Sequence, residues 1–304
     1  MPYLLPLLLL LAQDQPAFRS DVALVHVDAE VRQGSRLIDD LKKESFLVTE
    51  GGKPQAILYF GHQEEPLDVI LLFDTSTSMR PVVRRVAEAG HAAFTELRPG
   101  DRVAVMAFDC KTDLIADFTG DFGAAEKSIG NRVLRRAFRR CSPIQQALGE
   151  AARHFLKQSN GKRRRAVVII TDDQGTERRS GAVRDLWEAD AVVLGVIVRK
   201  GGIAANIHIG PPSSYGYRGM RDIAGETGGD ALNVNDAAEG LHEMISRLRL
   251  RYSLYYALPR GKPGDERPGE ERKIRVQLTS DAARGYPGAA VRARTGYVVP
   301  GANR

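Results

Sequence analysis

Apolar runs alternate with amphipathic segments through the middle of the chain, between residues 66 and 250. The apolar runs have the length and composition of buried strands, whereas the amphipathic segments repeat their apolar residues at helical spacing. The expected strands cover residues 69–73, 102–108, 114–118, 166–171, 191–198 and 231–234. The expected helices lie near residues 81–97, 143–158, 181–188, 217–227 and 236–249. This alternation predicts an α/β domain with a doubly wound, mainly parallel six-stranded sheet. The third strand follows the second too closely for a helical crossover, so we expect it to be an antiparallel edge strand.

The two ends of the chain show a different pattern, in which apolar and polar residues alternate with a period of two. Over residues 23–32 this alternation leaves one mostly polar face. Residues 46–50 and 55–60 flank a Gly-Gly-Lys-Pro turn and predict a hairpin. Because isolated two-stranded hairpins are only marginally stable, we expect residues 18–65 and 251–299 to pair into one small flanking β-sandwich. The α/β domain, at residues 66–250, is then inserted between the two halves of that sandwich.

The first 12 residues, which include five consecutive leucines, predict a signal peptide with cleavage after Ala12. This stretch is too short for a membrane span, which needs about 20 residues. It lacks the usual Lys or Arg before its apolar core, and a buried strand is the alternative interpretation. The rest of the 304-residue chain, which is 43% hydrophobic overall, has no segment long and apolar enough to span a bilayer. We therefore expect an exported protein, periplasmic or extracellular, without a transmembrane segment once the signal is removed.

One carboxylate and two hydroxyls follow the expected strand at residues 69–73. Asp74, Ser76 and Ser78 occupy alternate positions between this strand and the next expected helix. In open α/β sheets, ligands bind in the crevice at the carboxyl ends of the strands. Hard oxygen ligands of this kind suit Mg²⁺ or Mn²⁺ better than zinc or copper. The alternative interpretation is that Ser76 or Ser78 caps the following helix.

The pattern Asp74-x-Ser76-x-Ser78 after a buried strand resembles the metal-ion-dependent adhesion site of von Willebrand factor A domains. The resemblance implies a second loop that supplies a hydroxyl just before a helix, and Ser142 stands at that position. It also implies an aspartate at the end of the next parallel strand, where the sequence has Asp172. These five residues are the ligand set that the resemblance implies.

The sequence departs from the family pattern at two of these positions. Ser142 replaces the usual Thr, and Asp173 stands where glycine often follows the third-loop aspartate. The extra carboxylate of Asp173 would either strengthen cation binding or weaken the approach of an acidic partner. Each ligand also has an alternative interpretation, because Ser142 before Pro143 is a good helix cap and Asp172 can be an ordinary turn residue. The three strand–loop–helix junctions together favour the metal site.

The resemblance extends beyond the site and implies the Rossmann-like fold of these domains. Residues 97–108 are similar to the second-strand region of the family, and residues 222–234 to its last helix and strand. The flanking segments resemble the VWFA-related domain proteins common in Acidobacteria. The match covers residues 18–299 at the level of motifs.

The resemblance implies a function in protein binding rather than catalysis. The ion is expected to be Mg²⁺, with Mn²⁺ or Ca²⁺ as alternatives. With Asp172 binding through water, the ion stays electron-poor, and an Asp or Glu of a partner protein completes its ligand set. The same placement puts Cys110 and Cys141 at one edge of the sheet, where a disulfide would brace the Ser142 loop. Two buried free cysteines are the alternative.

Two other functions stay open at this point. Asp74 follows its strand as in haloacid-dehalogenase phosphatases, but Ser76 stands where that Mg²⁺-dependent class has its second Asp. An arginine cluster is the second candidate, as a binding site for a polyanion or an envelope surface; its members are Arg132, Arg135, Arg136, Arg139 and Arg140. The plain interpretation of this cluster is a solvated helix face, and no specific nucleic acid binding is expected. A Gly-, Pro- and Ser-rich segment at residues 201–219 is either a specificity loop or a plain connection.

Overall fold

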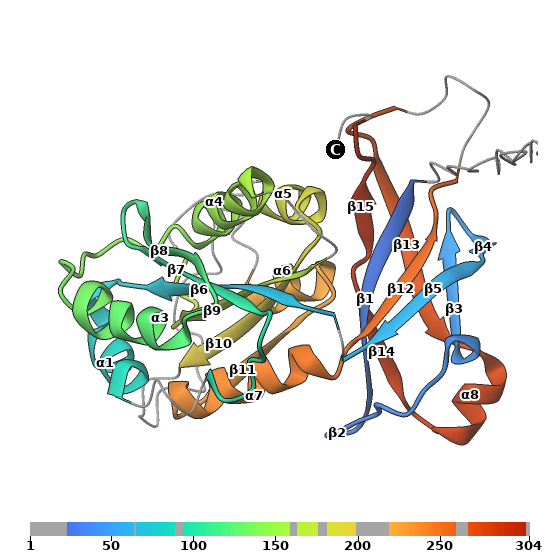
Figure 1. Ribbon diagram of the computed structural model, residues 1–304, viewed down its shortest axis with the longest axis horizontal. Helices are drawn as coiled ribbons and strands as arrows, with labels where there is room; N and C mark the ends of the chain where they lie inside the picture. The colour runs from blue at the N-terminus through green and yellow to red at the C-terminus, as the bar shows by residue number, and fades with distance from the viewer. Residues whose placement is uncertain are drawn as a thin grey trace, which may run out of the picture.

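An α/β domain and a β-sandwich lie side by side in the protein (Figure 1). The computed structural model describes residues 23–63, 65–88, 94–158, 163–175, 181–198, 219–259 and 267–301. The expected signal peptide and nearly all of the expected specificity loop lie outside these ranges. Among the described helices, none has both the length and the apolar character that crossing a membrane requires.

The α/β domain contains a six-stranded sheet in the order β11-β10-β9-β6-β7-β8. Its strands are β6 (Leu67–Asp74), β7 (Arg102–Phe108), β8 (Thr112–Thr119), β9 (Arg164–Thr171), β10 (Ala191–Val198) and β11 (Asp230–Val234). Strand β8 runs antiparallel to β7 at one edge, and the other neighbouring strands are parallel. Every residue of β6, β9 and β10 is buried, as in parallel sheets that are covered on both faces. The predicted fold class and the antiparallel edge strand are confirmed.

Helices cover both faces of this sheet (Figure 1). The helices are α1 (Arg80–Glu88), α3 (Phe122–Ser128), α4 (Ile144–Lys157), α5 (Ala182–Glu188), α6 (Met220–Glu226) and α7 (Ala237–Arg249). Val69, Leu71 and Phe73 of β6 pack in the core with α1, α3 and α7. Ile70 and Leu72 point to the other face, where α4, α5 and α6 complete a second core. The alternation of side chains along β6 thus joins two apolar layers, with the polar Asp74 at the end of the strand.

Two antiparallel sheets form the β-sandwich. The first has the order β14-β1-β12-β5, and the second has the order β15-β13-β3-β4. The strands are β1 (Leu24–Gln33), β3 (Phe46–Glu50), β4 (Lys53–Gln55), β5 (Ile57–His62), β12 (Tyr252–Ala257), β13 (Glu271–Leu278), β14 (Ala290–Ala293) and β15 (Gly296–Val298). A short strand β2 (Arg36–Leu37) pairs antiparallel with the end of β1, and α8 (Ser280–Gly285) follows β13. Strands β1 and β12 come from opposite ends of the chain and pair directly, from Leu24 opposite Ala257 to Ala29 opposite Tyr252.

The hairpin expected from residues 46–50 and 55–60 is wrong in its second strand. The hairpin partner of β3 is β4 and not β5, across a two-residue turn at Gly51 and Gly52 with φ of 55° and 79°. Positive φ at both central residues is the hairpin geometry that glycine allows without strain. Strand β5 instead crosses to the other sheet and pairs with β12. The continuous alternation of residues 55–60 therefore hides a change of sheet.

A buried joint of arginines and carboxylates connects the two domains. The polar face of β1 points towards the α/β domain, with Glu30 only 1% exposed. Arg247 of α7 binds Glu30 at 2.7 Å and Asp230 of β11 at 2.9 Å. Asp28 of β1 binds Arg164 at 2.8 Å and also forms an ion pair with Arg251. We call these six residues the interdomain joint.

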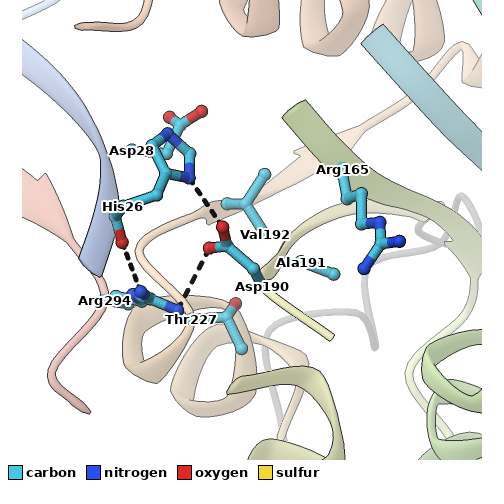
Figure 2. A pocket seen from close by; sticks show the side chains of 8 residues that line it. All are labelled: His26, Asp28, Arg165, Asp190, Ala191, Val192, Thr227 and Arg294. Carbon is cyan, nitrogen blue, oxygen red and sulfur yellow. Dashed lines mark hydrogen bonds and ion pairs between the residues drawn. The ribbon is translucent and has the colours of Figure 1, made fainter. Parts of the chain in front are cut away.

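The joint continues at a small pocket between the domains. Figure 2 shows Asp190 between His26 of β1 and Arg294, which follows β14. The carboxylate of Asp190 lies 2.8 Å from Nδ1 of His26 and 3.0 Å from the Arg294 guanidinium. The side chains of Asp190, His26 and Arg294 at this pocket therefore already bind one another.

Candidate metal centre

Asp74 lies at the centre of the carboxyl edge of the sheet, which is the edge where the parallel strands end. It is the last residue of β6, between β9 and β7, and it is fully buried. Thr75 fixes the chain directly after it, because both its N–H and its hydroxyl donate to the Phe108 carbonyl, at 2.7 and 2.9 Å. The chain then enters a 3₁₀ turn, Thr77–Met79, and α1. The strand end and the turn together fix the place of the carboxylate.

The Asp74 carboxylate accepts hydrogen bonds only from neutral donors among the described residues. Its Oδ1 accepts the Ser76 N–H at 2.8 Å. Its Oδ2 accepts the hydroxyls of Ser142 at 2.9 Å and Thr171 at 2.7 Å. Burial raises the pKa of Asp74, and the hydrogen bonds from Thr171, Ser76 and Ser142 oppose this only in part. A buried carboxylate therefore stands at this edge without a compensating charge from the described residues.

The structure brings all five predicted ligands into one hydrogen-bonded network. Ser76 and Ser78 place their hydroxyl oxygens 3.2 Å apart, and the Ser78 hydroxyl donates to Oδ2 of Asp172 at 2.6 Å. Asp74 joins the same network through Ser76 and Ser142. Loops that follow β6 and β9, and the loop before α4, thus meet at one point.

The helix-cap interpretations of the serines can be compared with the structure. Ser76 precedes the 3₁₀ turn, but its side chain makes no capping hydrogen bond. The residue at the N-cap of α4 is Pro143, and the hydroxyl of the preceding Ser142 donates to Asp74. The capping interpretation of Ser76 is therefore wrong, and Ser142 lies one residue before the N-cap of α4.

Thr171 belongs to the site and was missed from the sequence. Its hydroxyl donates to Asp74 and accepts the backbone N–H of Asp173 at 3.1 Å. The available signal was a single polar residue at the end of the otherwise apolar run of residues 166–170. A fully buried hydroxyl in that place needs a hydrogen-bond partner.

Asp173 has a role that the sequence pattern did not suggest. Its Oδ1 accepts the Met220 N–H at 3.1 Å, at the amino end of α6. Its φ is 58°, a left-handed conformation that glycine adopts freely and that aspartate tolerates. A glycine at this position would adopt the same backbone conformation without strain. The expected effect of Asp173 on cation or partner binding has no support in these contacts.

The segment before Ser142 is attached to the site in two ways. The Thr77 N–H donates to the Arg139 carbonyl at 2.9 Å, and Ser76 forms a parallel β-bridge with Arg139. A disulfide joins Cys141 to Cys110, with Cα atoms 4.9 Å apart. Cys110 lies just beyond β7, so the disulfide ties this segment to the carboxyl edge.

The donor atoms of the site are all oxygens. Carboxylate and hydroxyl oxygens suit hard divalent cations such as Mg²⁺, Mn²⁺ or Ca²⁺. Across the part of the chain that the structure describes, no three His, Cys, Asp or Glu side chains gather as a metal-binding group. A cation at this edge would depend on carboxylates and hydroxyls together.

Comparison with known proteins identifies the class of the α/β domain. Residues 69–175 match the family model of the von Willebrand factor type A domain. Over these residues the chain matches a von Willebrand factor type A domain. The matched region includes Asp74, Ser76, Ser78, Ser142 and Asp172.

Several solved structures are similar to this chain. One is described as an aerotolerance-related membrane protein from Bacteroides fragilis, at 16% identity, covering 60% of this chain and 98% of that one, with a TM-score of 0.44. Another is BatB from Bacteroides thetaiotaomicron, at 21% identity with the same coverages and TM-score. A von Willebrand factor type A protein from Catenulispora acidiphila, at 13% identity, covers 94% of this chain and 76% of that one, with a TM-score of 0.48. No curated protein matches the chain.

Proposed function

We propose that the protein is an exported module that binds a partner protein through a divalent cation. Asp74, Ser76, Ser78, Ser142 and Asp172 would hold Mg²⁺, and an Asp or Glu of the partner would complete its ligands. The observation that carries this proposal is the Asp74 carboxylate, which is fully buried and bound only by neutral donors among the described residues. Burying an uncompensated charge is costly, and a bound cation removes that cost.

The composition of the site supports an ion that remains open to a partner. Two carboxylates and three neutral hydroxyls leave a divalent ion with little excess negative charge around it. Mg²⁺ prefers six oxygens and keeps several waters when the protein supplies few charged ligands. A carboxylate from another protein can replace such a water in a charge-assisted contact. The disulfide between Cys110 and Cys141 supports the expected export, because disulfides persist in oxidising compartments.

No observation in the described residues favours the phosphatase alternative. That class needs a second carboxylate two residues after Asp74, where the hydroxyl of Ser76 lies against Ser78 instead. We therefore propose a binding role and not a catalytic one. A phosphatase assay with Mg²⁺ separates the two functions.

Cation binding is tested first by thermal unfolding of the full chain in Mg²⁺, Mn²⁺ or Ca²⁺ against EDTA. At a cation concentration of 100 times Kd, binding stabilises the folded state by about 2.7 kcal/mol. Asp74→Ala should abolish this stabilisation. The matched control is Asp121→Ala, which removes the exposed carboxylate that caps α3 and should leave the cation response intact. Absence of any cation response in the wild type would refute the metal site.

Partner binding is tested by a pull-down from the native envelope fraction, with and without EDTA. The wild type should retain a partner only with the cation present, and Asp74→Ala should retain none. A partner that binds equally well in EDTA and to Asp74→Ala would contradict the proposed mechanism.

A further inference from the structure

Four exposed arginines lie in the segment that leads into Ser142. We define the arginine rim as Arg132, Arg135, Arg139 and Arg140, all of which are exposed. The segment runs from a short π-helix, Ile129–Val133, to the disulfide at Cys141. Its attachment to the metal loop is direct, because the backbone of Arg139 pairs with Ser76 and Thr77. Arg139 therefore borders the candidate metal centre, and the other three rim arginines lie within seven residues of it along the same segment.

The positive charge of this rim is largely uncompensated. Between Glu126 and Glu150 the sequence contains no acidic residue. Arg136 differs from the rim, since its side chain is 16% exposed and binds Asp113 at 2.7 Å and Asp109 at 3.8 Å. Arg139 has only a 4.0 Å contact with Asp109, and its side chain is 57% exposed. The other three rim arginines form no ion pair with any residue that the structure describes.

The rim has no evident role in holding the fold together. The arginines that stabilise this protein, such as Arg247 and Arg251, are buried and bind carboxylates of the joint. The aromatic residue of the rim segment, Phe138, already lies under the Arg80 guanidinium, with 4.5 Å to its ring centre. No second aromatic interleaves with these arginines as a platform for stacked bases. The surface is therefore better suited to carboxylates than to single-stranded nucleic acid.

We infer that the partner of the metal site presents an acid-rich segment, in which one carboxylate binds the cation and its neighbours bind the arginine rim. This inference rests on the proposed function of the metal centre. Arginine binds carboxylates through a planar fork of donors, and exposed charges act over about 8–10 Å at physiological salt. A cation with Arg139 beside it and three more arginines on the same segment thus select a cluster of Asp and Glu over an isolated acidic residue.

The test measures binding of fluorescent synthetic peptides to the full chain in about 1 mM Mg²⁺, a concentration that suits weak sites for hard cations. One peptide carries an Asp flanked by two Glu on each side, and a second carries the same Asp flanked by Gln. The wild type should bind the Glu-flanked peptide about tenfold more tightly, as expected for several exposed ion pairs. EDTA and Asp74→Ala should each remove binding of both peptides.

Two charge-matched variants isolate the rim. The rim variant changes its four arginines to Gln and should bind both peptides equally, with its Mg²⁺ stabilisation retained. The control variant carries Lys42→Gln, Lys53→Gln, Lys43→Gln and Arg275→Gln, four exposed positions on the sandwich. It loses the same charge and should keep the preference for the Glu-flanked peptide.

The outcomes separate this inference from the proposed function. Equal binding of both peptides by the wild type, or a preference that survives in the rim variant, overturns the inference and leaves the metal site standing. Binding of the Glu-flanked peptide that persists in EDTA also overturns it, because the rim would then act as a polyanion site of its own. Failure of the cation to stabilise the wild type would remove the proposed function itself.

Discussion

Each end of strand β9 contacts an aspartate of another strand, and the two aspartates have different kinds of partner. At its amino end, Arg164 binds Asp28 of the interdomain joint. At its carboxyl end, Thr171 donates a hydroxyl to Asp74. Asp28 has guanidinium partners, whereas Asp74 has hydroxyl and backbone N–H partners. At one end of β9 the aspartate is neutralised by arginines, and at the other end the aspartate has only neutral partners among the described residues.

The two aspartates show this difference in their acidity. Burial alone would raise the pKa of Asp28, but the charges of Arg164 and Arg251 outweigh it and hold the pKa well below the ordinary value. Burial raises the pKa of Asp74, and neutral donors do not reverse that shift. A buried carboxylate that the chain neutralises is part of the structure. A buried carboxylate that the chain does not neutralise is a candidate ligand for an outside cation.

Removing an arginine of the joint should have the largest effect on stability. Arg247→Met removes the guanidinium that pairs with the buried carboxylates of Glu30 and Asp230. We expect a loss of about 3–5 kcal/mol in the free energy of unfolding. Urea denaturation measures it. The control is Arg292→Met, which removes another partner of Asp230 whose side chain is 41% exposed, and should cost no more than about 1 kcal/mol. Similar losses of stability in the two variants would show that the buried arginine contributes no more than the exposed one.

The main sheet was predictable because its strands are continuous apolar runs that only a doubly covered sheet can bury. The joint was not. The alternation in residues 23–32 indicated a polar face, but not that this face packs on a second domain. The arginines that bind this face are Arg164, Arg247 and Arg251. They are far away in the sequence, and no periodic pattern links them to Asp28 and Glu30. Pairing of distant charges depends on how the domains dock, which local patterns do not encode.

The loops that form the candidate site could be predicted from the sequence, whereas some of the contacts within it could not. Asp74, Ser76, Ser78, Ser142 and Asp172 were selected by their places next to strands and helices, and the structure gathers them. Their role as metal ligands stays a prediction. The hydrogen bond of Asp173 could not be predicted, because it depends on a left-handed backbone conformation. Thr171 left only one signal, a single polar residue at the end of an apolar strand.

Breaking the disulfide should weaken the site and spare the joint. Cys110→Ala with Cys141→Ala removes a link between residues 31 apart, and we expect a loss of about 2–4 kcal/mol. Hydrogen exchange should rise in residues 136–142 and stay unchanged around Glu30. Mg²⁺ affinity should fall, because Ser142 follows Cys141 directly. Two free thiols in the unfolded, unreduced wild type would show that this disulfide does not form.

The two aspartates should give opposite pH dependences of stability in EDTA. The pKa of Asp28 is lowered in the folded state, so its contribution is present above the ordinary value of 3.8 and is lost as the pH falls below it. The pKa of Asp74 is raised, so its favourable contribution is present below 3.8 and is lost as the pH rises through the folded-state pKa.

Denaturation of wild type, Asp28→Asn and Asp74→Asn between pH 3 and 7 measures these two slopes. The advantage of the wild type over Asp28→Asn should grow with pH, and its advantage over Asp74→Asn should shrink. Saturating Mg²⁺ should reverse the second trend, because the cation favours the charged carboxylate. Parallel trends for the two variants in EDTA would remove the distinction between joint and site.

The smallest expected effect compares two buried threonines at the carboxyl edge. Thr171→Val removes a hydroxyl that donates to the Asp74 carboxylate, and Thr75→Val removes one that donates to the Phe108 carbonyl. Each loss should cost about 1–2 kcal/mol of stability, with the larger cost at Thr171 because its acceptor is charged. Only Thr171→Val should weaken Mg²⁺ binding, by a few-fold in titration calorimetry. Of the two threonine hydroxyls, only that of Thr171 contacts the Asp74 carboxylate. A cation affinity unchanged in Thr171→Val would mean that the Asp74 carboxylate is held by Ser76 and Ser142 alone.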